Sequence, residues 1–297
     1  MKNSIRVKVT LSIVLLMVFF NGVVEAYTYG KFYYHPGVQE NRYEKLPYAP
    51  TLPTTSKAFD DSPQGYKDGC HANKHTSKIK VCTYGVKKGY KHTVAVIGDS
   101  HSGHWLGALQ KIASKQSIRI IYATKSGCAM SSKVRKDYPT CTTWNKNLIP
   151  TIMKYKPDLV LTKADTNTVG TGEKKYDYGM VDKFKELNRY GVKVFAIKNT
   201  MYFPEDSIKC IKKYGRHSVK CKVSRANIEK NPEWLKTLKA QPNVKYVDYA
   251  DLICDKKYCS PTQGNVIIVR DRHHLTNTYS KTFSYYLARD LMPFLRK

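Results

Sequence analysis

Three side chains that suit acyl transfer stand at opposite ends of the sequence. Ser100 lies in "VIGDSHSGHW", where an apolar run meets a helix-like pattern, and Asp271 and His274 lie in "VRDRHHLT". A serine nucleophile needs a base to remove its proton and a carboxylate to orient that base. If the two segments meet in the fold, His274 can face Ser100 while Asp271 holds the imidazole.

Each of these residues also has a purely structural interpretation. Ser100 stands where a hydroxyl can cap the following helix, and His273 with His274 can belong to a polar surface turn. His101 and His104 suggest a metal, but carboxylate or cysteine partners at fitting spacing are missing. We therefore expect no metal and no other cofactor, and the nucleophile hypothesis depends on the joint presence of both segments.

Elements that could bring the two segments together alternate along the sequence. Strand-like apolar runs cover 93–99, 118–127, 157–165, 192–200 and 244–254, and helix-like segments cover 103–116, 142–156, 176–191, 231–242 and 278–295. We expect Thr142 or Thr143 to cap the second helix at its start, and Gly191 to end the third. The alternation predicts an α/β fold, a doubly wound, flavodoxin-like parallel sheet with helices on both faces.

Ligands of such sheets bind at the carboxyl ends of the strands. This rule selects residues 98–101, 124–127 and 163–170 as the lining of a site. Gly127 ends the second strand, and it can bring its backbone N–H close to a bound acyl group.

The first residues resemble an export signal. Lys2, Arg6 and Lys8 precede an apolar run over 11–20, and "VVEA" follows. The run is too short for a comfortable membrane span, so a cleaved signal peptide over 1–26 is expected, with an uncleaved signal anchor as the alternative. The mature protein would be secreted or extracytoplasmic.

The rest of the sequence divides into two parts. Residues 27–91 are rich in Tyr, Pro, Lys and Gly and predict an extended lead-in whose end is stapled by a disulfide. Residues 92–297 predict the α/β domain.

The eight cysteines favour the same oxidising compartment. They fall into four close-spaced pairs along the sequence. Because eight cysteines allow many connectivities, it is a hypothesis that each cysteine bonds to its nearest neighbour. The hypothesis gives the pairs Cys70–Cys82, Cys128–Cys141, Cys210–Cys221 and Cys254–Cys259.

A formal net charge of +28 favours polyanionic partners. For an exported protein these are acidic surface polymers or a membrane surface. The alternative is that the positive charge only keeps the protein soluble and has no specific partner. Nucleic acid is disfavoured by the signal segment and the expected disulfides.

Several blocks resemble a known family. "VIGDSHSGHW" and "DRHHLT" are similar to the first and last blocks of SGNH hydrolases, and specifically to the extracytoplasmic SGNH domain fused to membrane acyltransferases that O-acetylate surface polysaccharides. "DGCHANKHTSKIKVCTYG" and "TKSGCAMS" resemble that subtype too, so the likeness extends from about Cys70 to the C-terminus. It implies Ser100 as nucleophile, His274 as general base and Asp271 as the orienting carboxylate. The N–H groups of Ser100 and Gly127 would form the oxyanion hole.

Two departures from the family pattern stand out. The third block, G-x-N-D, is replaced by "LTKADTNTVG"; its asparagine supplies an oxyanion donor, and Asn167 lies nearby but out of register. Members of this type also carry a multi-helix membrane domain that delivers the acyl group, and this sequence shows none. The resemblance then implies a separate membrane acyl-donor protein, esterase action or lost catalysis.

Together these features predict an exported serine-dependent acyl-ester enzyme. It would be an O-acetyltransferase or acetylesterase acting on a cell-surface or extracellular glycan. The alternative is a catalytically weak or inactive SGNH-fold module that binds acidic surface polymers.

Overall fold

A computed structural model describes residues 34–42, 45–165, 177–227 and 232–297. The expected signal peptide over 1–26 lies outside these ranges and stays a prediction. Within them, none of the helices combines the length and the apolar character that crossing a bilayer requires.

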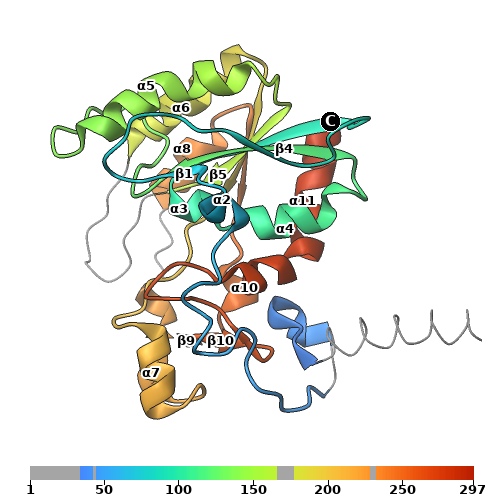
Figure 1. Cartoon of the computed structure of the whole chain (residues 1–297), viewed down its shortest axis with the longest axis vertical. Helices are drawn as coiled ribbons and strands as arrows, with labels where there is room; N and C mark the ends of the chain where they lie inside the picture. The colour runs from blue at the N-terminus through green and yellow to red at the C-terminus, as the bar shows by residue number, and fades with distance from the viewer. Residues whose placement is uncertain (1–33, 43–44, 166–176, 228–231) are drawn as a thin grey trace, which may run out of the picture.

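The centre of the molecule is a sheet of seven strands, most of them parallel (Figure 1). Its order is β1-β4-β3-β5-β6-β8, with β2 also paired to β4. The five parallel strands β4-β3-β5-β6-β8 follow the flavodoxin-like order, so the predicted fold class is confirmed. The strands of the sheet are β1 (His71–Ala72), β2 (Cys82–Gly85), β3 (His92–Gly98), β4 (Ile118–Lys125), β5 (Leu159–Lys163), β6 (Lys193–Ile197) and β8 (Val244–Val247).

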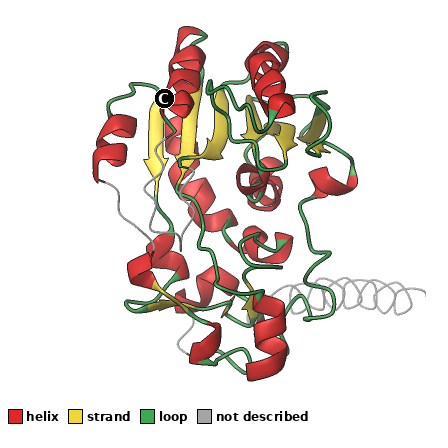
Figure 2. Cartoon of the chain, turned by 90° about the vertical axis from the view of Figure 1, so that its left-hand side faces the viewer, coloured by secondary structure: helices red, strands yellow, loops and turns green. Residues whose placement is uncertain are grey.

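Helices cover both faces of this sheet, as the edge-on view in Figure 2 shows. Because side chains alternate along a strand, Val94 and Val96 of β3 pack on one face with α4, α10 and α11, while Ala95 and Ile97 pack on the other with α5, α6 and α8. The α-helices are α2 (Gln64–Lys67), α3 (Ser100–Gly103), α4 (Leu106–Ala113), α5 (Pro139–Met153), α6 (Tyr178–Arg189), α7 (Ser207–Tyr214), α8 (Pro232–Lys239), α9 (Ala250–Ile253), α10 (Asn277–Thr282) and α11 (Ser284–Arg296).

Smaller elements form the part of the molecule below the sheet in Figure 1, around α7. Two short antiparallel pairs, β7 with β9 and β10 with β11, lie in this region of the chain. These elements are β7 (Val223–Ser224), β9 (Tyr258–Cys259), β10 (Thr262–Gln263), β11 (Val266–Ile267) and the 3-10 turns η1 (Gly37–Arg42), η2 (Val219–Cys221) and η3 (Arg225–Asn227).

Residues of the expected lead-in take part in the sheet. β1 runs parallel to β4 at the carboxyl end of β4, and β2 runs antiparallel to the rest of the same edge. Four disulfides form, with the nearest-neighbour pairing that the spacing predicts: Cys70–Cys82, Cys128–Cys141, Cys210–Cys221 and Cys254–Cys259. The first of them joins the start of β2 to the residue before β1.

Two predicted helix ends differ in outcome. Gly191 follows α6 with φ +70, the left-handed conformation of a helix C-cap, so that prediction is confirmed. Thr142 and Thr143 are not the N-cap of α5, because the helix already begins at Pro139. Proline suits the first turn of a helix, since the N–H that it lacks has no partner there.

The corner between β3 and α3 is fixed by Asp99. Its carboxylate caps α3 by accepting hydrogen bonds from the N–H groups of His101 (3.0 Å) and Ser102 (3.3 Å). It also forms an ion pair with the Lys163 ammonium at the end of β5, and both side chains are less than a tenth exposed. Gly98 precedes the corner with φ +122, and a Cβ added there would lie 2.5 Å from Ser102 Oγ. The neighbouring strand ends are therefore tied together at this corner.

The Asp99–Lys163 pair predicts an asymmetric response to substitution. Lys163→Met should lower the free energy of unfolding by about 3 kcal/mol or more, because it leaves a buried carboxylate uncompensated. Asp99→Asn/Lys163→Met should recover most of the loss, since Asn keeps the helix cap without the charge. Urea unfolding followed by circular dichroism measures both.

The pair between Lys198 and the more exposed Asp248, 3.1 Å apart, provides the control. Lys198→Met should cost less than about 1 kcal/mol, as expected for partly solvated ion pairs. Equal losses for Lys163→Met and Lys198→Met would contradict the importance of the buried pair.

Candidate active site

Ser100, His274 and Asp271 form one hydrogen-bonded array. His274 Nε2 lies 3.0 Å from Ser100 Oγ, and His274 Nδ1 lies 2.6 Å from Asp271 Oδ2. An ionised carboxylate only accepts hydrogen bonds, so Nδ1 carries the proton and Nε2 is left to accept from the Ser100 hydroxyl. The two distant sequence segments thus meet with the predicted residues in contact.

The loop after β11 holds Asp271 in its ionised form. Burial raises the pKa of this carboxyl, but hydrogen bonds from the His274 ring and from the N–H groups of His273 and His274 outweigh it, so the pKa lies below its usual value. The Arg270 N–H also donates to the His274 carbonyl oxygen at 2.8 Å. The imidazole therefore keeps one tautomer and one orientation.

Ser100 does not cap the helix that it begins. Asp99 is the N-cap of α3, and Ser100 is its first helical residue, so the capping interpretation of Ser100 is wrong. The surface-turn interpretation of His273 and His274 is also wrong, because both side chains are half-buried and contact the α3 corner.

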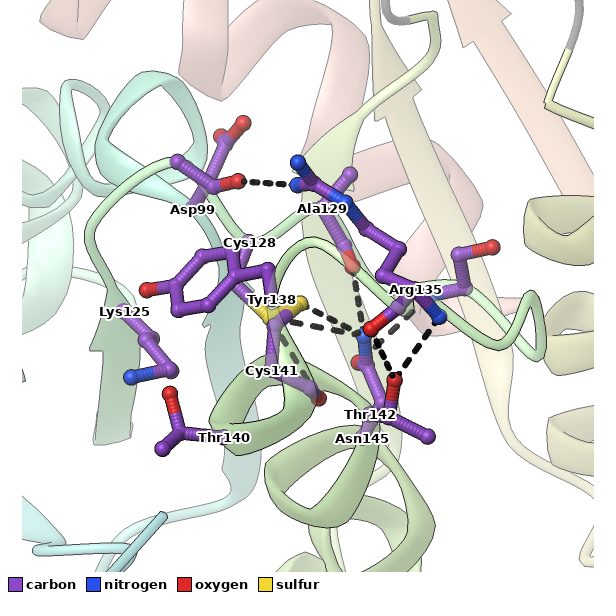
Figure 3. The surroundings of a disulfide bond; sticks show 12 residues. Asp99, Lys125, Cys128, Ala129, Arg135, Tyr138, Thr140, Cys141, Thr142 and Asn145 are labelled. Atoms are coloured by element: carbon purple, nitrogen blue, oxygen red, sulfur yellow. Dashed lines mark hydrogen bonds between the residues drawn. A yellow bond between two sulfur atoms is a disulfide. The ribbon is translucent and has the colours of Figure 1, made fainter. Parts of the chain in front are cut away.

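The loop that carries Gly127 is anchored around a disulfide (Figure 3). Asn145 Nδ2 lies 3.5 Å from both sulfur atoms of Cys128–Cys141 and donates to the Ala129 carbonyl oxygen at 2.8 Å. Tyr138 Oη donates to the Ser126 carbonyl oxygen at 2.7 Å, and Arg135 donates to that of Gly127 at 3.1 Å. The backbone at 126–129 is held from several sides, although it has no regular secondary structure.

A cavity of about 340 Å³ opens at this array. Ser100 and Gly127 both line it, and the backbone N–H of neither has a hydrogen-bond acceptor among the described residues. Gly127 adopts φ +58, and a Cβ built on it would meet no atom within 4 Å. The cavity is lined by Tyr66, His71, Lys74, Asp99, Ser100, His101, Ser126, Gly127, Tyr202, Arg270, His273 and His274.

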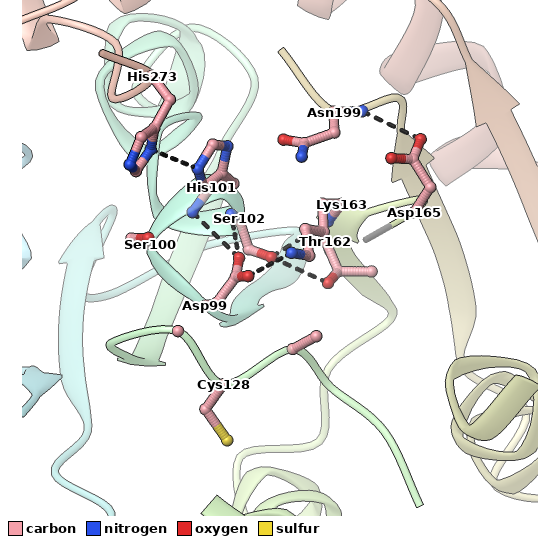
Figure 4. A network of polar contacts seen from close by, with 12 residues as sticks. Asp99, Ser100, His101, Ser102, Cys128, Thr162, Lys163, Asp165, Asn199 and His273 are labelled. Carbon is pink, nitrogen blue, oxygen red and sulfur yellow. Dashed lines mark hydrogen bonds and ion pairs between the residues drawn. The ribbon is translucent and has the colours of Figure 1, made fainter. Parts of the chain in front are cut away.

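A second imidazole pair, His101 and His273, lies close to Ser100, and Figure 4 shows the contact between the two rings. His101 Nε2 lies 3.0 Å from His273 Nδ1 and 3.2 Å from Tyr202 Oη. Ring nitrogens of His101, His273 and His274 all lie within 4.8 Å of one another, which is close enough for a metal ion. The His101 and His273 nitrogens already bond to each other, and Ser100 and Asp271 engage both nitrogens of His274, so we interpret the cluster as a hydrogen-bond network.

The imidazoles beside the array are neutral at ordinary pH. Burial lowers the pKa of His273 to about 4, with a further contribution from the charge of His274. Burial also sets the pKa values of His101 and His104 well below their usual value. The cluster therefore adds no positive charge next to His274.

The sequence did not single out five residues of the cavity wall: Tyr66, His71, Lys74, Tyr202 and Arg270. Tyr66 and Arg270 flank the array, and Tyr202 contacts His101 from the loop after β6. Only Arg270 had a usable signal, since it is adjacent to Asp271. Asn167, the weakest predicted donor, lies outside the described residues.

Matched disulfide variants test whether the Gly127 loop must be rigid. Cys128→Ser/Cys141→Ser and Cys210→Ser/Cys221→Ser open loops with sequence separations of 13 and 11. Each pair should cost about 3 kcal/mol in free energy of unfolding. Only the first should also lower the rate of p-nitrophenyl acetate hydrolysis, by about 10- to 100-fold, because it displaces the donor loop. Equal rate losses in both variants would contradict this role.

The neutral histidines predict acid sensitivity. Unfolded histidines bind protons near pH 6.5, whereas His71 and His273 have folded pKa values of about 4. The unfolded state therefore binds more protons between about pH 6.5 and 4, and the free energy of unfolding should fall steadily as the pH drops through this window. Urea midpoints measured from pH 7.5 to 4 check it, and a flat profile would contradict it.

Comparisons with known proteins agree with this architecture. A family model described as SGNH domain (fused to AT3 domains) matches residues 69–289. The fold is similar to that of the periplasmic domain of a lipopolysaccharide acetyltransferase from Salmonella ser. Paratyphi A, with a TM-score of 0.52 and 17% identity over 71% of this chain and 85% of that one. No curated protein matches the sequence. Because the family model spans most of the sequence, the chain belongs to the SGNH domain family of the kind described as fused to AT3 domains.

Proposed function

We propose that this protein is a serine-dependent acyl-ester enzyme, an O-acetyltransferase or acetylesterase, that acts outside the cytoplasm on glycan hydroxyl groups. Ser100 would be the nucleophile, His274 the general base and Asp271 the carboxylate that orients the base. The observation that carries the proposal is the Ser100–His274–Asp271 array at the wall of an open cavity.

The array's geometry suits a two-step acyl transfer. In the first step Ser100 Oγ bonds to the acyl carbon while its proton moves to His274 Nε2. The bond from that carbon to the leaving oxygen then breaks, and the proton passes from Nε2 to the leaving oxygen. In the second step an acceptor hydroxyl or water attacks the acyl-enzyme, gives its proton to Nε2, and releases Ser100 with that proton.

Two backbone donors would stabilise the charge that develops on the carbonyl oxygen. Ser100 and Gly127 line the same cavity, and their N–H groups have no acceptor within the described ranges. The other N–H groups at the start of α3 already have acceptors: those of His101 and Ser102 donate to the Asp99 carboxylate, and that of Gly103 donates to the Asp99 carbonyl oxygen. This arrangement supports an oxyanion hole at Ser100.

Two observations support a glycan as the substrate: the similarity to a solved structure, and the residue types that line the cavity. The solved relative is a periplasmic domain of a lipopolysaccharide acetyltransferase. The cavity wall combines aromatic rings with the cations Lys74 and Arg270, which suits a polar, acidic acceptor. The four disulfides suit an oxidising compartment, and an acyl donor would come from a separate membrane protein or an ester substrate.

Active-site labelling tests this function. A fluorophosphonate probe should label the wild-type protein, and Ser100→Ala should abolish labelling. Asp271→Asn should lower the rate of p-nitrophenyl acetate hydrolysis by about 10⁴-fold, because the imidazole loses its productive tautomer. Gel fluorescence and absorbance at the nitrophenolate band measure the two effects.

Ser114→Ala is the matched control, since Ser114 is exposed at the end of α4. Labelling that survives in Ser100→Ala would remove Ser100 from the mechanism. A wild-type protein that is folded but never labelled would favour the module that only binds acidic polymers.

A further inference from the structure

Arg270 is a cation of the cavity wall that the two-step acyl transfer does not use. It lines the same cavity as Ser100 and is only 9% exposed. Its Nη1 donates to the Phe59 carbonyl oxygen at 3.1 Å, and its buried Nε has no partner among the described residues. Within the described ranges the guanidinium forms no ion pair with a carboxylate. A nearly buried cation is thus left with a single neutral hydrogen-bond acceptor.

Two aromatic rings hold the guanidinium in place. Its central carbon lies 5.5 Å from the centre of the Tyr66 ring and 5.9 Å from that of the Phe59 ring. Tyr66 lines the cavity too, and its ring stacks on His71 with centroids 3.9 Å apart and planes 6° apart. An arginine packed on aromatic rings keeps its planar fork of N–H donors in one orientation. Arg270 can therefore bind an anion without first ordering its own side chain.

Lys74 adds a second cation to the same wall. Its backbone is anchored, because Thr140 Oγ1 donates to the Lys74 carbonyl oxygen at 2.6 Å. The residue is exposed, and its ammonium has no hydrogen-bond or ion-pair partner among the described residues. A solvated ammonium on a flexible side chain contributes attraction to an anion more than a fixed contact. We therefore assign Lys74 a supporting role beside Arg270.

The carboxylates near the cavity are already engaged. Asp99 pairs with Lys163 and caps α3. Asp271 accepts hydrogen bonds from one imidazole and from two backbone N–H groups, and it forms no ion pair with Arg270. Two cations, Lys74 and Arg270, thus face one carboxylate that lacks a cation of its own. The wall is positively charged on balance, and it has an unpaired guanidinium where a counter-charge would lower the cost of burial.

We propose that Arg270, supported by Lys74, binds an anionic group of the acceptor glycan, a carboxylate or a phosphate, close to the hydroxyl that is acylated. The inference rests on the proposed function for the identity of the ligand as an acyl acceptor. Both anions match the fork of a guanidinium, which can donate two parallel hydrogen bonds to either. The cavity volume of about 340 Å³ is at the lower end for small-molecule sites. An anion at Arg270 and a hydroxyl at Ser100 therefore belong to one sugar residue or to adjacent ones.

Equilibrium binding of matched sugars tests the inference without requiring catalysis. Methyl β-D-glucuronide carries a carboxylate where methyl β-D-glucoside carries a neutral hydroxymethyl group. The wild-type protein should bind the glucuronide at least about 10-fold more tightly, as expected for a charge-assisted hydrogen-bonded pair. Glucose 6-phosphate, measured in the same way, shows whether the phosphate or the carboxylate is the better ligand. Titrations followed by NMR chemical shifts give all three dissociation constants.

Substitutions assign the preference to single residues. Arg270→Gln should weaken glucuronide binding by about 10-fold and leave glucoside binding unchanged, whereas Arg270→Lys should keep part of the preference because it keeps the charge without the fork. Lys74→Gln should cost less than about threefold, since Lys74 is exposed. Arg119→Gln is the matched control. Arg119 also lies over an aromatic ring, that of Tyr90 at 4.1 Å, and donates to a backbone carbonyl, but it is near the start of β4, away from the strand ends of the site.

The outcomes separate this inference from the proposed function. Equal affinity of the wild-type protein for the glucoside and both anions would overturn the inference, and so would a folded Arg270→Gln that keeps the preference or an equal loss in Arg119→Gln. If the fluorophosphonate labels Ser100 and the preference is absent, the anion site is wrong while the function stands. If the preference depends on Arg270 but Ser100 is never labelled, the enzymatic function fails and the anion site remains, as part of a module that binds acidic glycans.

Discussion

The buried carboxylate of Asp99 is the constraint on which the candidate site depends. It caps α3 and pairs with Lys163, so one side chain joins the end of β3, the start of α3 and the end of β5. A buried carboxylate is tolerated only with such partners, and any movement of these strand ends would expose or unpair it. Ser102 strengthens the corner, because its hydroxyl contacts Thr162 Oγ1 at 3.1 Å and accepts from the Lys163 N–H at 3.1 Å. Ser100 lies between Asp99 and Ser102 and takes its position from the two central strands of the sheet.

The other half of the site depends on long-range contacts with the N-terminal stretch. Asp61 accepts hydrogen bonds from the N–H groups of Asn277 (2.8 Å) and Thr278 (2.9 Å), where α10 begins just after the His274 loop. Phe59 accepts from Arg270 in the same way. The region between residues 45 and 91 therefore supports the histidine loop and also sends Tyr66 into the cavity. It is a structural part of the site.

Periodicity and local spacing explain what the sequence could predict. The strand runs at β3, β4, β5 and β6 are buried on both faces, and this gives the continuous apolar stretches from which the sheet was predicted. Asp271 and His274 are three residues apart, so their contact needs only a tight loop. Tyr66 and Arg270 are some two hundred positions apart, with no periodic pattern around Tyr66, and their contact depends on the tertiary fold alone. The start of α5 was missed for a related reason, because proline in the first turn competes with a threonine cap.

Lys163, at the end of β5, belongs to the segment that replaces the family's third block, G-x-N-D. An asparagine donor at that strand end would need an open position facing the acyl group, but Lys163 instead directs its ammonium to Asp99 and is buried there. In the described part of this strand end, the Lys163 side chain neutralises the buried corner. None of the described residues at the end of β5 lines the cavity. Tyr66, His71 and Lys74, from the stretch around β1, line the cavity beside Ser100. The same stretch contributes β1 to the sheet and is joined to β2 by Cys70–Cys82, so this wall of the cavity is built into the fold and is not a separate attachment to it.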